Sequence, residues 1–271
     1  MTYPLAVSRP RHPFVQSPHP VALAHRGGGR EAPENSLTAF RNSTALGLRY
    51  LETDVRATSD GRVMVFHDAT LNRVTDRVGR IRALPYSEVR RAKIGGADNV
   101  MLLEELLEEF PDARINIDVK DDHTLTPFVE AIRRTNTGDR ICIASFSGSR
   151  LRAARVALGP TVATSLAPPE VAGLVAASRL GPFARLASVA LPSNAACVQV
   201  PVRQGRVPIV THSFISEAHR RGLAVHVWTI NDEPTMNRLL DMGVDGLVTD
   251  RPTLLRSVLQ SRGQWGARAI S

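Results

Sequence analysis

The sequence predicts a (β/α)₈ barrel, the TIM barrel architecture, with a small insertion after the second strand. Short runs of apolar and β-branched residues alternate eight times with segments in which apolar residues recur every three or four positions. This alternation is typical of parallel βα units. The chain has 271 residues, and a barrel of about 250 residues would use nearly all of them. A doubly wound open sheet is the competing architecture.

The predicted strands and helices follow one another along the chain from residue 21 onward. The strands are expected at residues 21–25, 50–55, 114–120, 141–146, 161–166, 196–201, 224–230 and 245–250. The helices are expected at residues 36–47, 102–110, 124–136, 149–159, 169–181, 213–222, 233–243 and 252–261. Several of the helical segments end at glycine, which is common at helix C-termini.

One segment interrupts this alternation after the second strand. Ser59, Asp60 and Gly61 form a turn signal that leads into the extended run at residues 62–68. This run is predicted to be a hairpin partner or a strand at the edge of a loop. The polar, glycine-containing stretch at residues 68–101 predicts a small insertion above the second strand.

The ends of the chain and its hydropathy set the domain organisation. Residues 1–20 are rich in proline and lack the apolar region of a signal peptide, so we expect a loose extension followed by one barrel domain over residues 21–260. No run approaches the roughly 18 apolar residues that a membrane-spanning helix needs. We therefore expect a cytoplasmic protein without stable membrane insertion.

Composition narrows the range of partners. The formal net charge is +8, but arginine supplies all but two of the 34 basic residues, and the two lysines are Lys93 and Lys120. The basic residues form no long block and aromatic residues make up only 5%, which argues against nucleic-acid binding. Cys142 and Cys197 lie in apolar runs without metal-site spacing and are predicted to be buried free thiols.

Strand alternation directs several charged side chains into the barrel. Glu52 and Asp54 share one face of the second strand, and Asp118 and Lys120 share one face of the third. Three inward carboxylates are costly unless a cation neutralises them, and the candidates are a hard metal ion and Lys120. An all-oxygen site suits Mg²⁺ or Ca²⁺ better than zinc. The simpler alternatives are ion-paired carboxylates at a strand end and an ordinary surface lysine.

Two histidines are expected near the same rim. His25 ends the first strand and His67 ends the hairpin run, and two histidines can divide the roles of base and acid near neutral pH. Each histidine taken alone is more often structural. The glycines at 27–29 lack the downstream signature of a phosphate-binding P-loop and are expected to let the chain turn tightly beneath a ligand.

An ordered set of short motifs resembles one enzyme family, the glycerophosphodiester phosphodiesterases. The motifs are HRG at 25–27, PEN at 33–35, ETD at 52–54, HD at 67–68, DVK at 118–120 and VWTIN at 227–231. Each motif is weak alone, but their order and spacing are specific. The resemblance spans residues 21 to about 256, nearly the whole chain.

The resemblance implies a barrel whose mouth holds one divalent cation, Mg²⁺ or Ca²⁺, with Mn²⁺ also possible. It implies that three carboxylates ligate the metal, that two histidines form the acid and base pair, and that the remaining site residues contact substrate. These are Glu52, Asp54 and Asp118 for the metal, His25 and His67 for proton transfer, Arg26 and Lys120 for phosphate, Trp228 for the glycerol or head group, and Asn35 for support.

Three of these assignments have a competing interpretation in the sequence itself. The family usually has glutamate where this chain has Asp118, and the shorter side chain withdraws the carboxylate by roughly 1.5 Å. Direct ligation, a bridging water and a larger ion all stay open. Asn35 is also a candidate N-cap for the helix that follows, and Trp228 is a candidate for plain core packing.

The expected reaction is metal-dependent hydrolysis of a small-molecule glycerophosphodiester to glycerol 3-phosphate and an alcohol. Two alternatives stay open. One is cleavage of lysophospholipids by a lysophospholipase D-type enzyme, which a long apolar groove in the insertion would favour. The other is a non-catalytic barrel that only binds anions. The sequence does not predict the head group, the metal or the oligomeric state.

Overall fold

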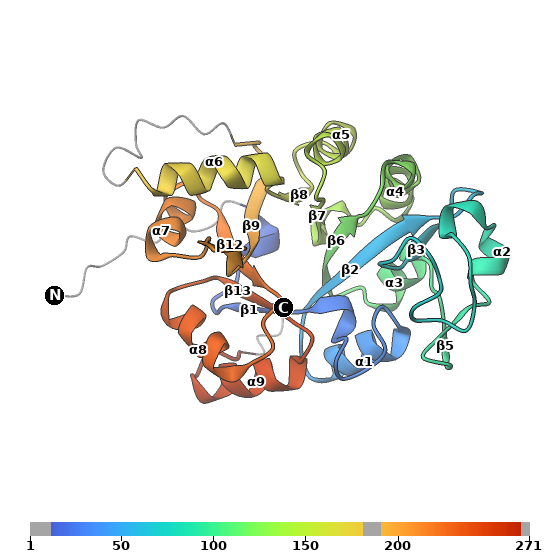
Figure 1. The fold of residues 1–271 in the computed structure, drawn as a ribbon, viewed down its shortest axis with the longest axis horizontal. Coiled ribbons are helices and arrows are strands. Elements are labelled where there is room, and N and C mark those ends of the chain that lie inside the picture. The colour runs from blue at the N-terminus through green and yellow to red at the C-terminus, as the bar shows by residue number, and fades with distance from the viewer. Residues whose placement is uncertain (1–11, 181–190, 267–271) are drawn as a thin grey trace.

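Eight parallel strands form a closed barrel in the computed structural model, which describes residues 12–180 and 191–266 (Figure 1). Strand β1 pairs with both β2 and β13, which closes the sheet. The predicted barrel is confirmed, and the open-sheet alternative is wrong. The barrel strands are β1 Val21–Ala24, β2 Tyr50–Ala57, β6 Arg114–Val119, β7 Ile141–Ala144, β8 Ala163–Ser165, β9 Ala195–Pro201, β12 Ala224–Trp228 and β13 Gly246–Thr249.

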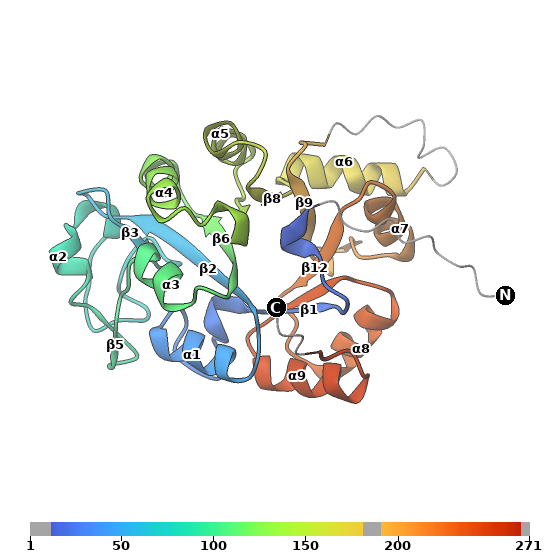
Figure 2. The ribbon, with the colours of Figure 1, turned by 180° about the vertical axis from the view of Figure 1, so that it is seen from behind.

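Helices surround the barrel, as both ribbon views show (Figures 1 and 2). They are α1 Leu37–Ala45, α3 Leu103–Glu109, α4 Asp122–Thr135, α5 Gly148–Leu158, α6 Pro168–Ser178, α7 His212–Arg220, α8 Glu233–Asp241 and α9 Pro252–Ser261. Each matches a predicted helix, although Gly181, the last residue of the fifth predicted helix (observed as α6), lies outside the described residues. Five of these helices have an N-cap residue whose side chain accepts a hydrogen bond from a backbone amide of the first turn. The capping residues are Ser36, Asp121, Ser147, Thr211 and Asp232. Within the described ranges, no helix is long and apolar enough to cross a membrane.

The predicted hairpin partner is β3 Val63–Val65, which pairs antiparallel with β2. The insertion that follows contains α2 Tyr86–Val89 and the short antiparallel pair β4 Lys93–Ile94 and β5 Asp98–Asn99. It has its own apolar cluster, which includes Phe66, Leu71, Ile81, Val89 and Ile94. A second small hairpin, β10 Arg203–Gln204 with β11 Val207–Pro208, was not expected from the sequence.

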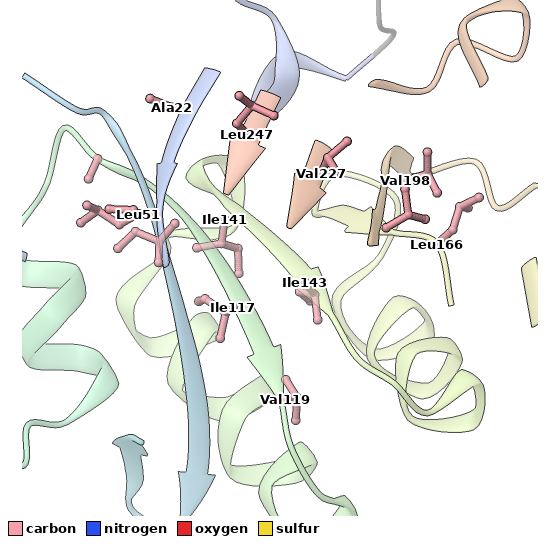
Figure 3. Packing of buried hydrophobic residues seen from close by; sticks show 14 of the residues in the cluster. Ala22, Leu51, Ile117, Val119, Ile141, Ile143, Leu166, Val198, Val227 and Leu247 are labelled. Atoms are coloured by element: carbon pink, nitrogen blue, oxygen red, sulfur yellow. The ribbon is translucent and has the colours of Figure 1, made fainter. Parts of the chain in front are cut away.

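Alternation along the strands separates two environments. Leu51, Ile117, Val119 and Ile143 point into the apolar layer between strands and helices (Figure 3). Their neighbours Glu52, Asp54, Asn116 and Asp118 are buried on the opposite face of the same strands, and they line a cavity in the barrel. The register of β2 with β6 sets Asp54 beside Asp118.

The segment before β1 departs from the expected loose extension. Residues 1–11 lie outside the described residues, but Pro13–Val15 form a 3₁₀ turn and the Phe14 side chain is fully buried. Phe14 packs with Tyr50, Cys142 and Cys197 in one apolar cluster. Burial of the aromatic ring stabilises the folded chain, so this part of the segment is held against the barrel and is not a loose extension. Both cysteines are buried free thiols as predicted, with their sulfur atoms 3.9 Å apart.

Candidate active site

A tight turn at the end of β1 carries His25 and Arg26. It is the 3₁₀ turn η2 His25–Gly27, and Arg26, Gly27 and Gly28 have φ of 52°, 81° and 101°. Glycine adopts this left-handed region readily, and a Cβ on Gly27 would lie 2.8 Å from the Cβ of Ala39. The turn points the Arg26 backbone amide at Glu52 Oε2, 3.0 Å away. The loop and the β2 carboxylate are thereby fixed to each other.

Three carboxylates and a lysine line the barrel cavity together. They are Glu52 and Asp54 from β2, Asp118 from β6 and Lys120 directly after it. The Lys120 ammonium lies 2.6 Å from Asp54 Oδ1 and 2.7 Å from Asp118 Oδ2. Its side chain is only 12% exposed, so the surface-lysine alternative is wrong.

Charges in this cluster are unevenly compensated. Burial, followed by the charge of Asp54, raises the pKa of Glu52 to about 7. Burial acts on Asp54 too, but the Lys120 ammonium and the Arg26 guanidinium outweigh it and lower the pKa of Asp54. Burial opposes the charge of Lys120, yet Asp54 and Asp118 outweigh it and raise the pKa of the ammonium. Glu52 is therefore the carboxylate that still lacks a permanent cation of its own.

The donor chemistry of this cluster fits a hard divalent cation. Three buried carboxylates face two permanently charged side chains, Arg26 and Lys120, and carboxylate oxygen is the ligand that Mg²⁺ and Ca²⁺ prefer. Asp118 Oδ1 is buried and accepts no hydrogen bond from any described residue. No three His, Cys, Asp or Glu side chains within the described ranges form a ready metal-binding group, and Lys120 lies between two of the carboxylates.

His25 is oriented by a carboxylate from the far end of the chain. Its Nδ1 lies 2.6 Å from Asp250 Oδ1, and Asn231 donates a hydrogen bond to the other Asp250 oxygen. An ionised carboxylate only accepts hydrogen bonds, so Nδ1 is protonated and donates to Asp250. Nε2 is then the ring nitrogen that can take up or release a proton. Burial alone would lower the pKa of His25, but the charge of Glu52 and the bond to Asp250 outweigh it and raise that pKa.

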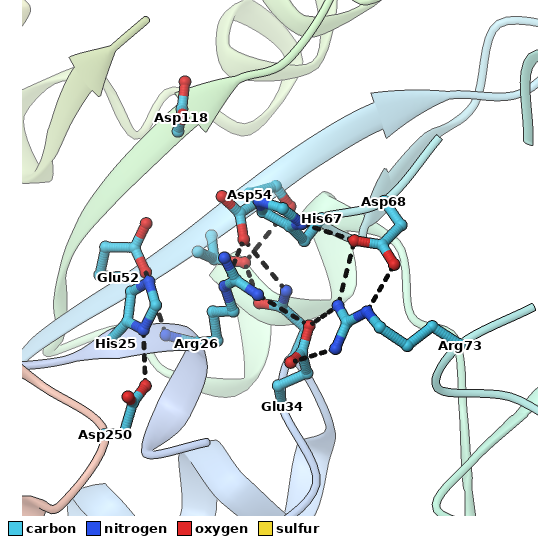
Figure 4. Close-up of polar contacts among 12 residues, drawn as sticks. His25, Arg26, Glu34, Glu52, Asp54, His67, Asp68, Arg73, Asp118 and Asp250 are labelled. Atoms are coloured by element: carbon cyan, nitrogen blue, oxygen red, sulfur yellow. Dashed lines mark hydrogen bonds and ion pairs between the residues drawn. The ribbon is translucent and has the colours of Figure 1, made fainter. Parts of the chain in front are cut away.

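His67 belongs to a network of ion pairs at the rim, drawn in Figure 4. We call His67, Asp68, Arg73, Glu34 and Arg26 the rim network. His67 Nδ1 lies 2.6 Å from Asp68 Oδ1, and the Arg73 guanidinium donates to both oxygens of Asp68 and both oxygens of Glu34. Glu34 Oε1 also accepts from Arg26 Nη1 at 3.0 Å. One arginine of the insertion thereby connects the His67 loop to the Arg26 loop.

Asn35 supports the carboxylates and does not cap the following helix. Its Nδ2 donates to Asp54 Oδ2 at 3.3 Å, and its Oδ1 accepts from the Thr53 hydroxyl at 2.8 Å. The N-cap of α1 is Ser36, whose hydroxyl accepts the Ala39 amide. The capping alternative for Asn35 is therefore wrong, because its side chain is engaged with β2.

The cavity lined by the three carboxylates and Lys120 has a volume of about 830 Å³. His25 and His67 both face it, as do Arg26 and Trp228. The Trp228 ring is half-buried and meets the exposed Phe146 ring edge-on, with centroids 6.0 Å apart. Trp228 is thus a wall of the cavity as well as a neighbour of the interior cluster.

Four residues of the site had no role in the sequence prediction. They are Glu34, Asp68, Arg73 and Asp250. Glu34 and Asp68 stood inside the motifs that carry the family resemblance, and Asp250 ended the last predicted strand at the same rim as His25. The place of Arg73 in the site could not be predicted, because nothing in the sequence distinguishes it from the other arginines of the insertion.

Comparisons with known proteins point to one family. The sequence profile of the Glycerophosphoryl diester phosphodiesterase family matches residues 25–254. A "Probable glycerophosphodiester phosphodiesterase 2" of Mycobacterium tuberculosis is 39% identical over 253 residues, which cover 93% of this chain and 95% of that protein.

Solved structures share the fold. A putative glycerophosphoryl diester phosphodiesterase from Silicibacter pomeroyi superimposes with a TM-score of 0.75 at 25% identity, over 93% of this chain and 98% of that one. An Oleispira antarctica phosphodiesterase, solved in complex with the product sn-glycerol-3-phosphate, gives 0.72 at 24% identity, over 89% and 97%. On the profile match and the mycobacterial relative, the chain belongs to the glycerophosphodiester phosphodiesterase family and is a phosphoric diester hydrolase.

Proposed function

We propose that this chain hydrolyses glycerophosphodiesters to glycerol 3-phosphate and an alcohol, with one divalent cation and with His25 and His67 as the proton carriers. The observation that carries the proposal is the convergence of both histidines, three carboxylates, Arg26 and Lys120 on one cavity. Glu52, Asp54 and Asp118 would hold the cation. When bound, such a cation polarises the phosphate and stabilises the negative charge that builds on its oxygens.

The remaining residues divide the other tasks. Arg26 and Lys120 would hold the non-bridging phosphate oxygens, and both are already placed against the carboxylates that flank them. His25 and His67 each have Nδ1 bonded to a carboxylate, which leaves Nε2 of each ring to take or give a proton. One would deprotonate the attacking oxygen and the other would protonate the departing alcohol. Trp228 would wall the side of the cavity against the organic part of the substrate.

The test is release of glycerol 3-phosphate from glycerophosphocholine by protein treated with chelator, before and after addition of Mg²⁺, Ca²⁺ or Mn²⁺. We expect turnover to be lost on chelation and restored by at least one ion. Glu52→Gln should abolish it, because it removes a charged ligand, whereas Glu108→Gln on exposed α3 surface should not. Full turnover of chelated protein would refute the metal requirement. Absence of turnover with every ion would favour the non-catalytic, anion-binding alternative.

A further inference from the structure

One arginine of the insertion holds two carboxylates that belong to different loops. Arg73 Nε and Nη2 donate to the two oxygens of Asp68 at 2.6 and 3.0 Å. Arg73 Nη1 and Nη2 donate to the two oxygens of Glu34 at 2.9 and 2.6 Å. Both contacts are bidentate, which the planar guanidinium fork allows and a lysine ammonium does not. Figure 4 shows the guanidinium between the two carboxylates.

The turn that carries Arg73 is fixed by the apolar cluster of the insertion. Leu71 is buried in that cluster, and Val74 packs against it. The Thr75 amide donates to the Leu71 carbonyl at 3.2 Å, and Thr75 forms an antiparallel bridge with Ile94. The backbone on both sides of Arg73 is therefore anchored, although its side chain is half exposed.

The first of the two carboxylates fixes the His67 ring. Asp68 Oδ1 accepts from Arg73 Nη2 and lies 2.6 Å from His67 Nδ1. The hydrogen bonds from Arg73 lower the pKa of Asp68, so the carboxylate stays ionised near neutral pH and can only accept from the ring. Arg56 Nε donates to the His67 carbonyl at 2.7 Å. Ring and backbone of His67 are thus both held, which leaves its Nε2 to exchange a proton.

The second carboxylate fixes the Arg26 guanidinium. Glu34 Oε1 accepts from Arg26 Nη1 at 3.0 Å as well as from Arg73 Nη2. Asp54 Oδ2 lies 3.2 Å from Arg26 Nε, so two sides of this guanidinium are engaged. Its Nη2 donates to no residue that the structure describes. That nitrogen is therefore left to donate to a phosphate oxygen.

We propose that Arg73 is a positioning residue for two groups of the active site. Through Asp68 it orients the His67 ring. Through Glu34 it orients the Arg26 guanidinium. This rests on the proposed function, which gives these two groups their tasks in proton transfer and phosphate binding. Arg73, Asp68 and Glu34 are not among the described residues that line the cavity, so their effect on the reaction is indirect. The insertion then supports the active site and is not an accessory to the barrel.

The first measurement is kcat and KM for glycerophosphocholine at saturating metal, with folding of each variant checked by circular dichroism. Asp68→Asn should lower kcat about tenfold or more and leave KM within about twofold, because it frees only the ring that transfers a proton. Glu34→Gln should raise KM about threefold or more, because it loosens the group that binds phosphate. Arg73→Leu should do both.

Arg91→Leu is the matched control, since Arg91 is an exposed arginine of the same insertion, and it should change neither constant. A folded Arg73→Leu variant with kcat and KM within about twofold of wild type would overturn the proposal. Arg73→Lys keeps the positive charge but lacks the fork, so its kcat should stay about fivefold or more below wild type. Full recovery of kcat by lysine would show that charge alone suffices, and it would overturn the bidentate role.

The second measurement tests whether Arg73 acts through His67. Arg73→Leu should lower kcat about tenfold in the wild-type background but by less than about twofold in the His67→Ala background, because the ring to be positioned is then absent. Losses of kcat that multiply in the double variant would overturn the proposal, since Arg73 would then act independently of the ring.

Failure of this inference and failure of the proposed function give different results. Turnover by wild type that Arg73→Leu leaves unchanged would refute the inference alone. Absence of turnover by wild type on every diester, with each ion supplied, would refute the proposed function itself.

Discussion

On the side of the barrel mouth formed by the ends of β13, β1, β2 and β6 and by the insertion, the charged side chains stand in ion pairs with one another. His25 has Asp250, Lys120 has two carboxylates, and Arg73 holds two more. On the side formed by β8, β9 and α6, the wall of the same cavity is mostly aliphatic. The first side is therefore held by directional contacts and the second by shape and hydrophobicity.

The difference teaches how the two sides divide their tasks. Proton transfer and phosphate neutralisation depend on the position of single atoms, so these side chains need partners that fix their rotamers. Recognition of an apolar group depends on buried area and tolerates small displacements. Substitutions on the charged side should thus affect every substrate, whereas substitutions on the aliphatic side should affect only substrates that reach it.

The largest expected effect comes from the two histidines. His25→Ala and His67→Ala should each lower kcat by about 10² or more on every glycerophosphodiester tested, as expected for a general acid or base. His212→Ala, at an exposed position outside the cavity, is the control. A folded variant at either position with near-normal kcat would show that this histidine is structural. It would contradict the assignment of proton transfer to the charged side of the cavity.

Asp118 should give an intermediate effect that sharpens the metal assignment. Its Oδ1 has no hydrogen-bond partner among the described residues, while its Oδ2 is held by Lys120. Asp118→Glu should tighten Mg²⁺, which demands contacts of about 2.1 Å, more than Ca²⁺, which tolerates about 2.3–2.6 Å. Asp118→Asn should weaken both ions by about tenfold. Activity titrated with each metal measures this, and identical curves for all three proteins would show that residue 118 is not a ligand.

The smallest expected effect is on stability and its pH dependence. Hydrogen bonds to Arg73 lower the pKa of Asp68, and despite burial they and Arg26 lower that of Glu34. Carboxylates with depressed pKa values stabilise the fold above their ordinary pKa near 4 and lose this contribution as the pH falls. Arg73→Leu should therefore cost about 1 kcal/mol in unfolding free energy at pH 7, since Arg73 is half exposed. The cost should be smaller at pH 3, where the carboxylates of the unfolded chain are mostly protonated and part of the contribution is already lost.

Denaturant unfolding at both pH values measures this difference. Arg91→Leu is the control, because Arg91 is an exposed arginine of the same insertion without an ion pair among the described residues. An equal loss at pH 3 and pH 7 would mean that Arg73 acts by packing. The ion pairs of the rim network would then not be what stabilises the charged side of the cavity.

The barrel strands and their helices could be predicted because each is a local pattern. A strand such as RINIDV shows alternation within its own six residues, and that alternation alone placed Asp118 inward. The pairing of His25 with Asp250 could not be predicted in the same way, since 225 positions separate them and only barrel closure brings them together. The β10–β11 hairpin was missed because each strand has only two residues, too few to show a period.

The part of the cavity wall that α6 forms could not be predicted for a different reason. In the sequence, PPEVAGLVAAS is an ordinary apolar helix, and an apolar helix in a barrel packs against strands by default. Only the three-dimensional arrangement shows that Leu174 and Ala177 are buried while Ala172 and Ala176 are exposed and line the cavity. Which apolar residues are left over for a ligand is a property of packing, not of composition.

Phe14 has a practical bearing on how this protein should be produced. The family match begins at residue 25, and an expression boundary drawn there would discard the fully buried Phe14 side chain. The backbone oxygen of Phe14 accepts hydrogen bonds from Tyr50 at 2.8 Å and Arg114 at 2.9 Å. The shortened polypeptide would therefore lose both the buried ring and these two hydrogen bonds. Recombinant versions should start no later than His12, and an affinity tag should be joined upstream of that residue.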